Sequence, residues 1–123
     1  MIDLRERLER GWSIDTTYCP ETYVGADPAH GQCAVTSVLV QEHLGGELVR
    51  GWADVDGRAV RHYWNRIGGL DVDLTWRQFP AGTSLRDAEV TTFEVLVANR
   101  WMLERLERLR AAAGLDRWEG RAA

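Results

Sequence analysis

The sequence contains no lysine, so all 15 of its basic residues are arginine. These arginines are dispersed along the chain, and 19 acidic residues bring the formal net charge to -4. Binding to nucleic acid or to a membrane surface needs a concentrated basic patch. We therefore expect a protein that binds neither nucleic acid nor a membrane.

The chain also lacks any apolar run close to the roughly 20 residues that a membrane-spanning helix requires. Its first ten residues are rich in charge, unlike the apolar region of a signal peptide. Only two cysteines are present, Cys19 and Cys33, whereas a disulfide-stabilised domain of this size would normally carry more. These features predict a cytoplasmic protein whose thiols are free.

The remaining composition is that of an ordinary globular protein. The 123 residues are 45% hydrophobic, which is enough for one core but not for two. No repeat or long linker divides the chain. The sequence therefore predicts a single domain over residues 1–123.

Periodicity predicts an α+β fold. We expect a charged amphipathic helix over residues 3–10, a long loop over 12–31 and a buried helix over 32–44. Three strands follow, which turn signals separate into an antiparallel meander over 47–53, 58–65 and 70–75. After an irregular stretch to about Val90, a single helix is expected over 93–113.

The expected buried helix begins at Cys33, directly after a glycine-containing loop. Unpaired backbone N–H groups and the positive end of a helix dipole favour the thiolate, which is the nucleophilic form of cysteine. The same N–H groups can hold an oxyanion. A free cysteine is, however, most commonly an inert, buried small residue. The position of Cys33 in the sequence favours neither the nucleophilic nor the inert interpretation.

His62 and Asp73 lie on the two strands that flank the Gly68-Gly69 turn. Opposite residues share a face, and side chains alternate between faces. A four-residue loop places His62 opposite Asp73, and a two-residue loop places Trp64 there. Both registers put His62 and Asp73 on one face, whereas a three-residue loop would separate them.

This placement predicts a nucleophile–base–orienter triad. Asp73 can accept a hydrogen bond from one imidazole nitrogen of His62, which leaves the other nitrogen free to take the proton of Cys33. Asp71 has the same parity as Asp73 and is the rival orienter. The alternative is an ordinary histidine of the sheet beside a carboxylate.

Three short blocks resemble the active-site pattern of transglutaminases. Gly31-Gln32-Cys33 looks like the head of their catalytic helix, His62-Tyr63-Trp64-Asn65 like their His-x-Trp-Asn strand, and Asp73-Leu74-Thr75 like their Asp-x-Thr strand. The order and the helix–strand–strand placement also match. Over residues 12–79 the chain is similar to the YunG-like small bacterial proteins, which carry the same blocks.

The resemblance implies a papain- or transglutaminase-like core, in which a catalytic-type helix packs on a small antiparallel sheet between N- and C-terminal helices. It implies cysteine-dependent chemistry on an amide or ester, as in a hydrolase, deamidase or acyltransferase. Cys33, His62 and Asp73 would be catalytic, and no metal or cofactor would be needed. Ala34 stands where transglutaminases usually have an aromatic residue, and their domains are much larger. The resemblance therefore supports the presence of the triad more strongly than it supports cross-linking activity.

Two neighbouring residues are weaker candidates. Gln32 could donate to an oxyanion, and Trp64 could contact substrate or shield the site, although an aromatic residue there is equally expected in the core. A zinc site is a further alternative, although its spacing matches no common pattern. Its ligands would be Cys19, His30, Cys33 and His62.

Two function classes remain open. The first is a cysteine enzyme that acts on a peptide, a protein or a small amide or ester. The second is a non-catalytic peptide- or partner-binding domain that retains the cleft, which the short chain favours because little of it remains to build substrate walls. A homodimer that completes the substrate site is a third alternative.

Overall fold

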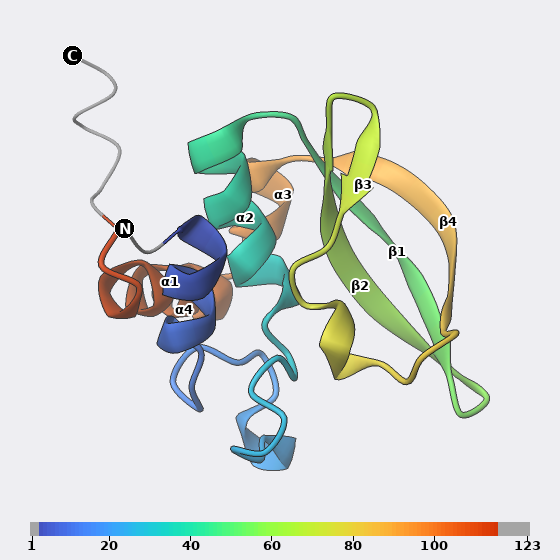
Figure 1. Cartoon of the computed structure of the whole chain (residues 1–123), viewed down its shortest axis with the longest axis horizontal. Helices are drawn as coiled ribbons and strands as arrows, with labels where there is room; N and C mark the ends of the chain where they lie inside the picture. The colour runs from blue at the N-terminus through green and yellow to red at the C-terminus, as the bar shows by residue number, and fades with distance from the viewer. Residues whose placement is uncertain (1–2, 116–123) are drawn as a thin grey trace.

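The computed structural model describes residues 3–115 and shows helices on one side of an antiparallel sheet (Figure 1). The helices are α1 (Leu4–Gly11), α2 (Cys33–Leu44), α3 (Phe93–Leu96) and α4 (Arg100–Ala112). The strands are β1 (Glu47–Val55), β2 (Arg58–Ile67), β3 (Leu70–Val72) and β4 (Ser84–Thr91). Two short 3-10 helices are η1 (Pro20–Thr22) and η2 (Trp76–Gln78). The expected α+β class is confirmed.

The sheet has the strand order β3-β2-β1-β4, and each neighbouring pair is antiparallel. β1 and β2 form a hairpin through Asp56-Gly57, whose φ angles of 51° and 76° suit the left-handed turns that hairpins favour. Gly68-Gly69 joins β2 to β3 as a two-residue loop. β3 ends at Val72, before the strand end expected at residue 75. The three-stranded meander is thus confirmed, with a shorter third strand.

β4 occupies residues 84–91, so the expectation of irregular chain up to about Val90 is wrong. The strand lies at the edge of the sheet, and only its last residue is buried. Its pairing with β1 shifts between Arg50 and Trp52, and Asp87 has a φ of 56°. A strand exposed on both faces shows no apolar alternation. The sequence therefore lacks the hydrophobic pattern that would have predicted β4.

Residues 93–113 form two helices where a single helix was expected. α3 ends at Leu96, and α4 begins at Arg100. The side chain of Asn99 caps the start of α4, because its Oδ1 accepts a hydrogen bond of 2.8 Å from the backbone N–H of Trp101. Asparagine is among the preferred residues at such a helix N-cap.

α2 lies at the centre of the molecule, between the sheet and the other helices (Figure 1). Its residues 34–40 are all buried, which is the expected behaviour of a helix that is apolar on every side. Gly45 and Gly46, with φ angles of 77° and 80°, end the helix. Within residues 3–115, no helix is both long enough and apolar enough to cross a membrane.

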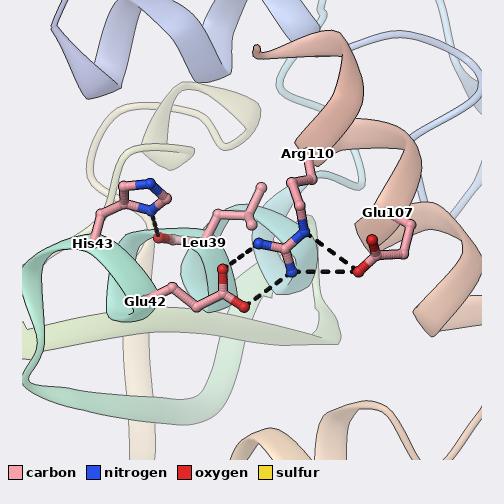
Figure 2. A network of polar contacts seen from close by, with 5 residues as sticks. All are labelled: Leu39, Glu42, His43, Glu107 and Arg110. Carbon is pink, nitrogen blue, oxygen red and sulfur yellow. Dashed lines mark hydrogen bonds and ion pairs between the residues drawn. The ribbon is translucent and has the colours of Figure 1, made fainter. Parts of the chain in front are cut away.

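An ion pair fastens α2 to α4. Arg110 of α4 donates from both terminal nitrogens to the carboxylate of Glu42 on α2, and it also contacts Glu107 on its own helix (Figure 2). The Arg110 side chain is only 8% exposed. The hydrogen bonds to Glu42 raise the pKa of Arg110 further above its ordinary value, so the guanidinium is always charged. The helix that begins with Cys33 is therefore anchored near its other end.

Candidate functional site

Cys33 is the first residue of α2 and is half-buried. The chain reaches it through Gly31, whose φ of 72° lies in the left-handed region. A Cβ atom at Gly31 would lie 2.1 Å from Oγ1 of Thr17, so no side chain fits there. The glycine thus lets the loop turn tightly into the helix and places the thiol beside the first-turn N–H groups.

His62 reaches Asp73 directly. The His62 Nε2 atom lies 2.6 Å from Asp73 Oδ2, so Nε2–H donates to the carboxylate. The two-residue loop puts Asp73 just beyond β3, and the contact with His62 in the middle of β2 is diagonal, because the register continues to Trp64 opposite Asp73. The His62 side chain is fully buried, and within residues 3–115 its Nδ1 has no hydrogen-bond partner. Nδ1 is therefore the nitrogen left to exchange a proton.

The charge on His62 reflects three neighbouring influences. Burial by itself lowers the pKa of the imidazole, because it disfavours the charged form. The hydrogen bond to Asp73 and the nearby Cys33 thiol outweigh burial and raise the pKa of His62 to about 9. The thiol acts at close range, although it makes no aligned hydrogen bond to Nδ1. Catalytic hydrogen bonds are often loose when no substrate is bound.

Asp73 is held by the residues that follow it. Its Oδ1 accepts hydrogen bonds from the Thr75 backbone N–H at 3.0 Å and from the Thr75 hydroxyl at 3.1 Å. Gln78 Nε2 donates to the same hydroxyl at 2.9 Å. The Gly31 N–H in turn points to Gln78 Oε1 at 3.4 Å. This chain of contacts links the carboxylate to the loop that precedes Cys33.

Asp71, the rival orienter, faces a different partner. Its Oδ1 accepts a hydrogen bond of 3.0 Å from Arg66 on the paired strand, in an exposed position. Asp73, rather than Asp71, therefore contacts His62.

Two aromatic rings enclose the imidazole. The Trp64 ring stacks on His62 with 5.6 Å between ring centroids, and the Phe79 ring meets it edge-on at 4.7 Å. Trp64 is only 3% exposed and fits because position 51 is a glycine, where a Cβ would lie 2.8 Å from the indole. The rings help to bury the imidazole, which strengthens its hydrogen bond to Asp73 electrostatically.

Both polar atoms of the Gln32 side-chain amide have hydrogen-bond partners in the N-terminal loop. Nε2 donates to the Ser13 carbonyl at 3.1 Å, and Oε1 lies 2.8 Å from the Thr16 hydroxyl, which can donate to it. The side chain is fully buried and anchors the N-terminal loop. Neither Gln32 nor Trp64 lines the pocket beside Cys33. The structure thus gives no support to contact between substrate and either of these two residues.

A pocket of about 450 Å³ opens beside Cys33. Its walls are mainly apolar, with a few polar side chains between them. The apolar walls include Val60, Tyr63, Phe79, Leu96 and Met102. The polar side chains include Arg61, Gln78 and Asn99. The sequence did not single out most of these residues, because they come from segments far apart in the chain and share no motif.

Cys19 lines the same pocket. Burial raises the pKa of its thiol, and the nearby Glu21 and Cys33 raise it further. Cys19 is therefore held as a neutral thiol at neutral pH. Within residues 3–115, no three histidine, cysteine, aspartate or glutamate side chains gather closely enough to hold a metal ion, so the alternative of a zinc site gains no support.

Comparison with known proteins shows the family of this chain. The family model described as YunG protein matches residues 1–114. The uncharacterized protein YunG of Bacillus subtilis (strain 168) is 31% identical to the chain over 74 residues. That alignment covers 60% of this chain and 58% of the relative, so it spans less than two thirds of the relative's length. No solved structure matches the chain.

Proposed function

The chain belongs to the YunG family, and we propose that it is a cysteine enzyme that acts on an amide or ester through Cys33, His62 and Asp73. One observation carries the proposal: a fully buried histidine is bound to a carboxylate through one nitrogen and lies beside a pocket-lining thiol. A histidine with a purely structural role in the sheet would pair with the carboxylate but would not require a thiol beside it. The triad order and its helix–strand–loop placement also support a papain- or transglutaminase-like core.

The proposed first half-reaction forms a thioester. Because the pKa of His62 is about 9, the imidazolium can serve as counter-ion to a Cys33 thiolate at neutral pH. The thiolate attacks the carbonyl carbon, and the first-turn N–H groups of α2 stabilise the oxyanion that forms. The bond to the amine or alcohol then breaks, and His62 gives its Nδ1 proton to the leaving group.

The second half-reaction releases the acyl group. A water molecule or an amine attacks the thioester carbonyl, and the now neutral His62 takes the proton from this nucleophile. Cys33 leaves as the thiolate, so the starting ion pair is restored. Asp73 keeps Nε2 protonated throughout and so directs every proton transfer through Nδ1. Water as acceptor gives hydrolysis or deamidation, and an amine gives acyl transfer.

Acetylation by p-nitrophenyl acetate tests this proposal. In a Cys19→Ser protein, we expect release of p-nitrophenolate and the mass increase of one acetyl group, located on Cys33 by peptide mass spectrometry. Replacing His62 by Ala should slow acetylation by about a hundredfold or more, the usual contribution of a positioned proton-transfer group. The matched control is His43→Ala, because His43 is exposed and its hydrogen-bond partner among the described residues is the Leu39 carbonyl of its own helix.

Two results would contradict a catalytic triad. One is acetylation of Cys33 at the same rate with and without His62. The other is the absence of any acetyl adduct on Cys33 in a folded protein. Either result would favour the alternative, a peptide- or partner-binding domain that uses the pocket without chemistry.

A further inference from the structure

The described walls of the pocket beside Cys33 include an arginine and no acidic side chain. Arg61 lines the pocket, and no aspartate or glutamate is among the described residues that form its walls. Arg61 is half-buried. An anionic group inside this pocket would therefore find an arginine and no carboxylate among the described wall residues.

Arg61 also differs from three of the other four arginines of the sheet, which are paired with carboxylates. Arg50 pairs with Glu89, and Arg66 pairs with Asp71, each across a strand boundary. Opposite Arg61 in the register stands Trp52, and the guanidinium lies 4.5 Å from the centre of its ring. A ring orients the cation through its face but accepts no conventional hydrogen bond.

Within residues 3–115, no hydrogen bond or ion pair engages the guanidinium of Arg61. Its planar group therefore presents unused N–H donors in the fork geometry that matches a carboxylate. The stacking on Trp52 fixes that group in advance, which lowers the entropy lost when an anion binds. Arg61 thus has the features of a built anion-binding side chain.

The walls and the volume of the pocket indicate which groups a bound molecule would carry besides an anionic group. A volume of about 450 Å³ falls within the range of about 300–1,000 Å³ that is usual for small-molecule sites. Val60, Phe79 and Leu96 are among its apolar walls. The pocket therefore suits a small molecule that has one apolar group and one carboxylate.

We propose that the pocket selects small acylated amino acids with an apolar side chain, and that Arg61 binds their carboxylate. This inference rests on the proposed function in one respect, because Cys33 would attack the amide carbonyl of the same molecule. Arg61 and His62 are consecutive in β2, so their side chains leave opposite faces of the strand, and Cys33 is the reacting residue that shares the pocket with Arg61. Arg61 is a specificity-determining residue in this arrangement and takes no part in the bond changes.

The test measures binding without chemistry. In a Cys33→Ser protein, N-acetyl-phenylalanine and its uncharged amide, N-acetyl-phenylalaninamide, are compared by calorimetry. We expect the acid to bind at least about tenfold more tightly than the amide, since a hydrogen bond to a charged group typically contributes that much or more. Arg61→Gln should remove the preference, and Arg61→Lys should keep part of it. The matched control Arg58→Gln changes an exposed arginine of the same strand and should leave the preference intact.

Equal affinity for acid and amide would overturn the proposal, and so would a preference that survives Arg61→Gln in a protein with unchanged circular dichroism. Failure to bind either ligand would overturn it as well. These outcomes are separate from the acetylation experiment. A preference for the acid without acetylation of Cys33 would retain the carboxylate site and contradict only the proposed chemistry.

Discussion

His62 is the residue whose chemistry depends most on its surroundings. Full burial would keep an isolated imidazole neutral, because the charged form is poorly solvated there. The Asp73 carboxylate and the Cys33 thiol reverse that preference and raise the pKa of His62 to about 9. The charge of His62 in β2 therefore depends on Cys33 in α2 and on Asp73 in the turn after β3.

This pKa predicts how stability changes with pH. Below pH 6.5, His62 is protonated in both the folded and the unfolded chain, and its stabilising contribution is fully present. As pH rises toward 9, the unfolded chain loses its proton first, so the contribution falls and is lost as pH passes the folded pKa. The free energy of unfolding should decrease by ~1.4 kcal/mol for each unit by which Asp73 alone raises the pKa of His62, which is seen when Cys33 is replaced by serine.

Urea unfolding of a Cys33→Ser protein between pH 6.5 and 9 measures this decrease, because in the intact protein a Cys33 thiolate paired with His62 would release a proton on folding and cancel the slope. We expect His62→Gln to abolish most of the slope and His43→Gln, at an exposed position, to leave it unchanged. A slope that persists in His62→Gln would show that another group titrates in this range and would contradict the assigned charge state.

At the residue scale, the sequence predicted the contact between His62 and Asp73 but not its geometry. The loop length was open, and parity alone placed both side chains on one face in two of the three registers. The structure has the two-residue loop, with Asp73 beyond the end of β3. Parity could not show that Thr75 and Gln78 would hold the carboxylate, because these contacts form after the strand has ended.

At the element scale, α2 carries Cys33 at one end and is anchored to α4 near the other end by the ion pair of Arg110 with Glu42 (Figure 2). Arg110→Ala would leave the Glu42 carboxylate half-buried without its main partner. We expect a loss of about 2 kcal/mol in the free energy of unfolding, below the ~3–5 kcal/mol of a fully buried pair because Glu42 is partly exposed.

Chemical denaturation measures this loss, and two further variants interpret it. Arg5→Ala breaks the exposed pair with Glu9 and should cost less than about 1 kcal/mol. Combining Arg110→Ala with Glu42→Ala should recover part of the loss, because no buried carboxylate then remains alone. Equal losses in Arg110→Ala and Arg5→Ala would contradict the anchoring role.

The elements differ in how well their patterns predicted them. α2 and the β1–β2 hairpin were predicted closely, because buried apolar residues and the signals Gly45-Gly46 and Asp56-Gly57 mark them. β4 was missed, because an edge strand exposed on both faces obtains its stability from backbone pairing with β1 rather than from a hydrophobic pattern. The break before α4 was also missed, although Asn99 is a recognisable cap.

At the scale of the whole molecule, the pocket joins segments that no sequence pattern connects. Arg61 comes from the sheet, Phe79 from the chain after η2, and Met102 from α4. Motifs single out Cys33, His62 and Asp73 because those residues lie in recognisable blocks, whereas pocket walls depend on tertiary packing. The contact between His62 and Asp73 could therefore be predicted from the sequence, and the residues that form the pocket could not.

The most direct test of the account is the pH dependence of Cys33 alkylation by iodoacetamide in a Cys19→Ser protein, with and without His62→Ala. If Cys33 and His62 form an ion pair, alkylation should stay fast well below the ordinary thiol pKa of ~8.5 and should become slow when His62 is removed. Alkylation that follows an ordinary thiol and is unchanged by His62→Ala would contradict the triad.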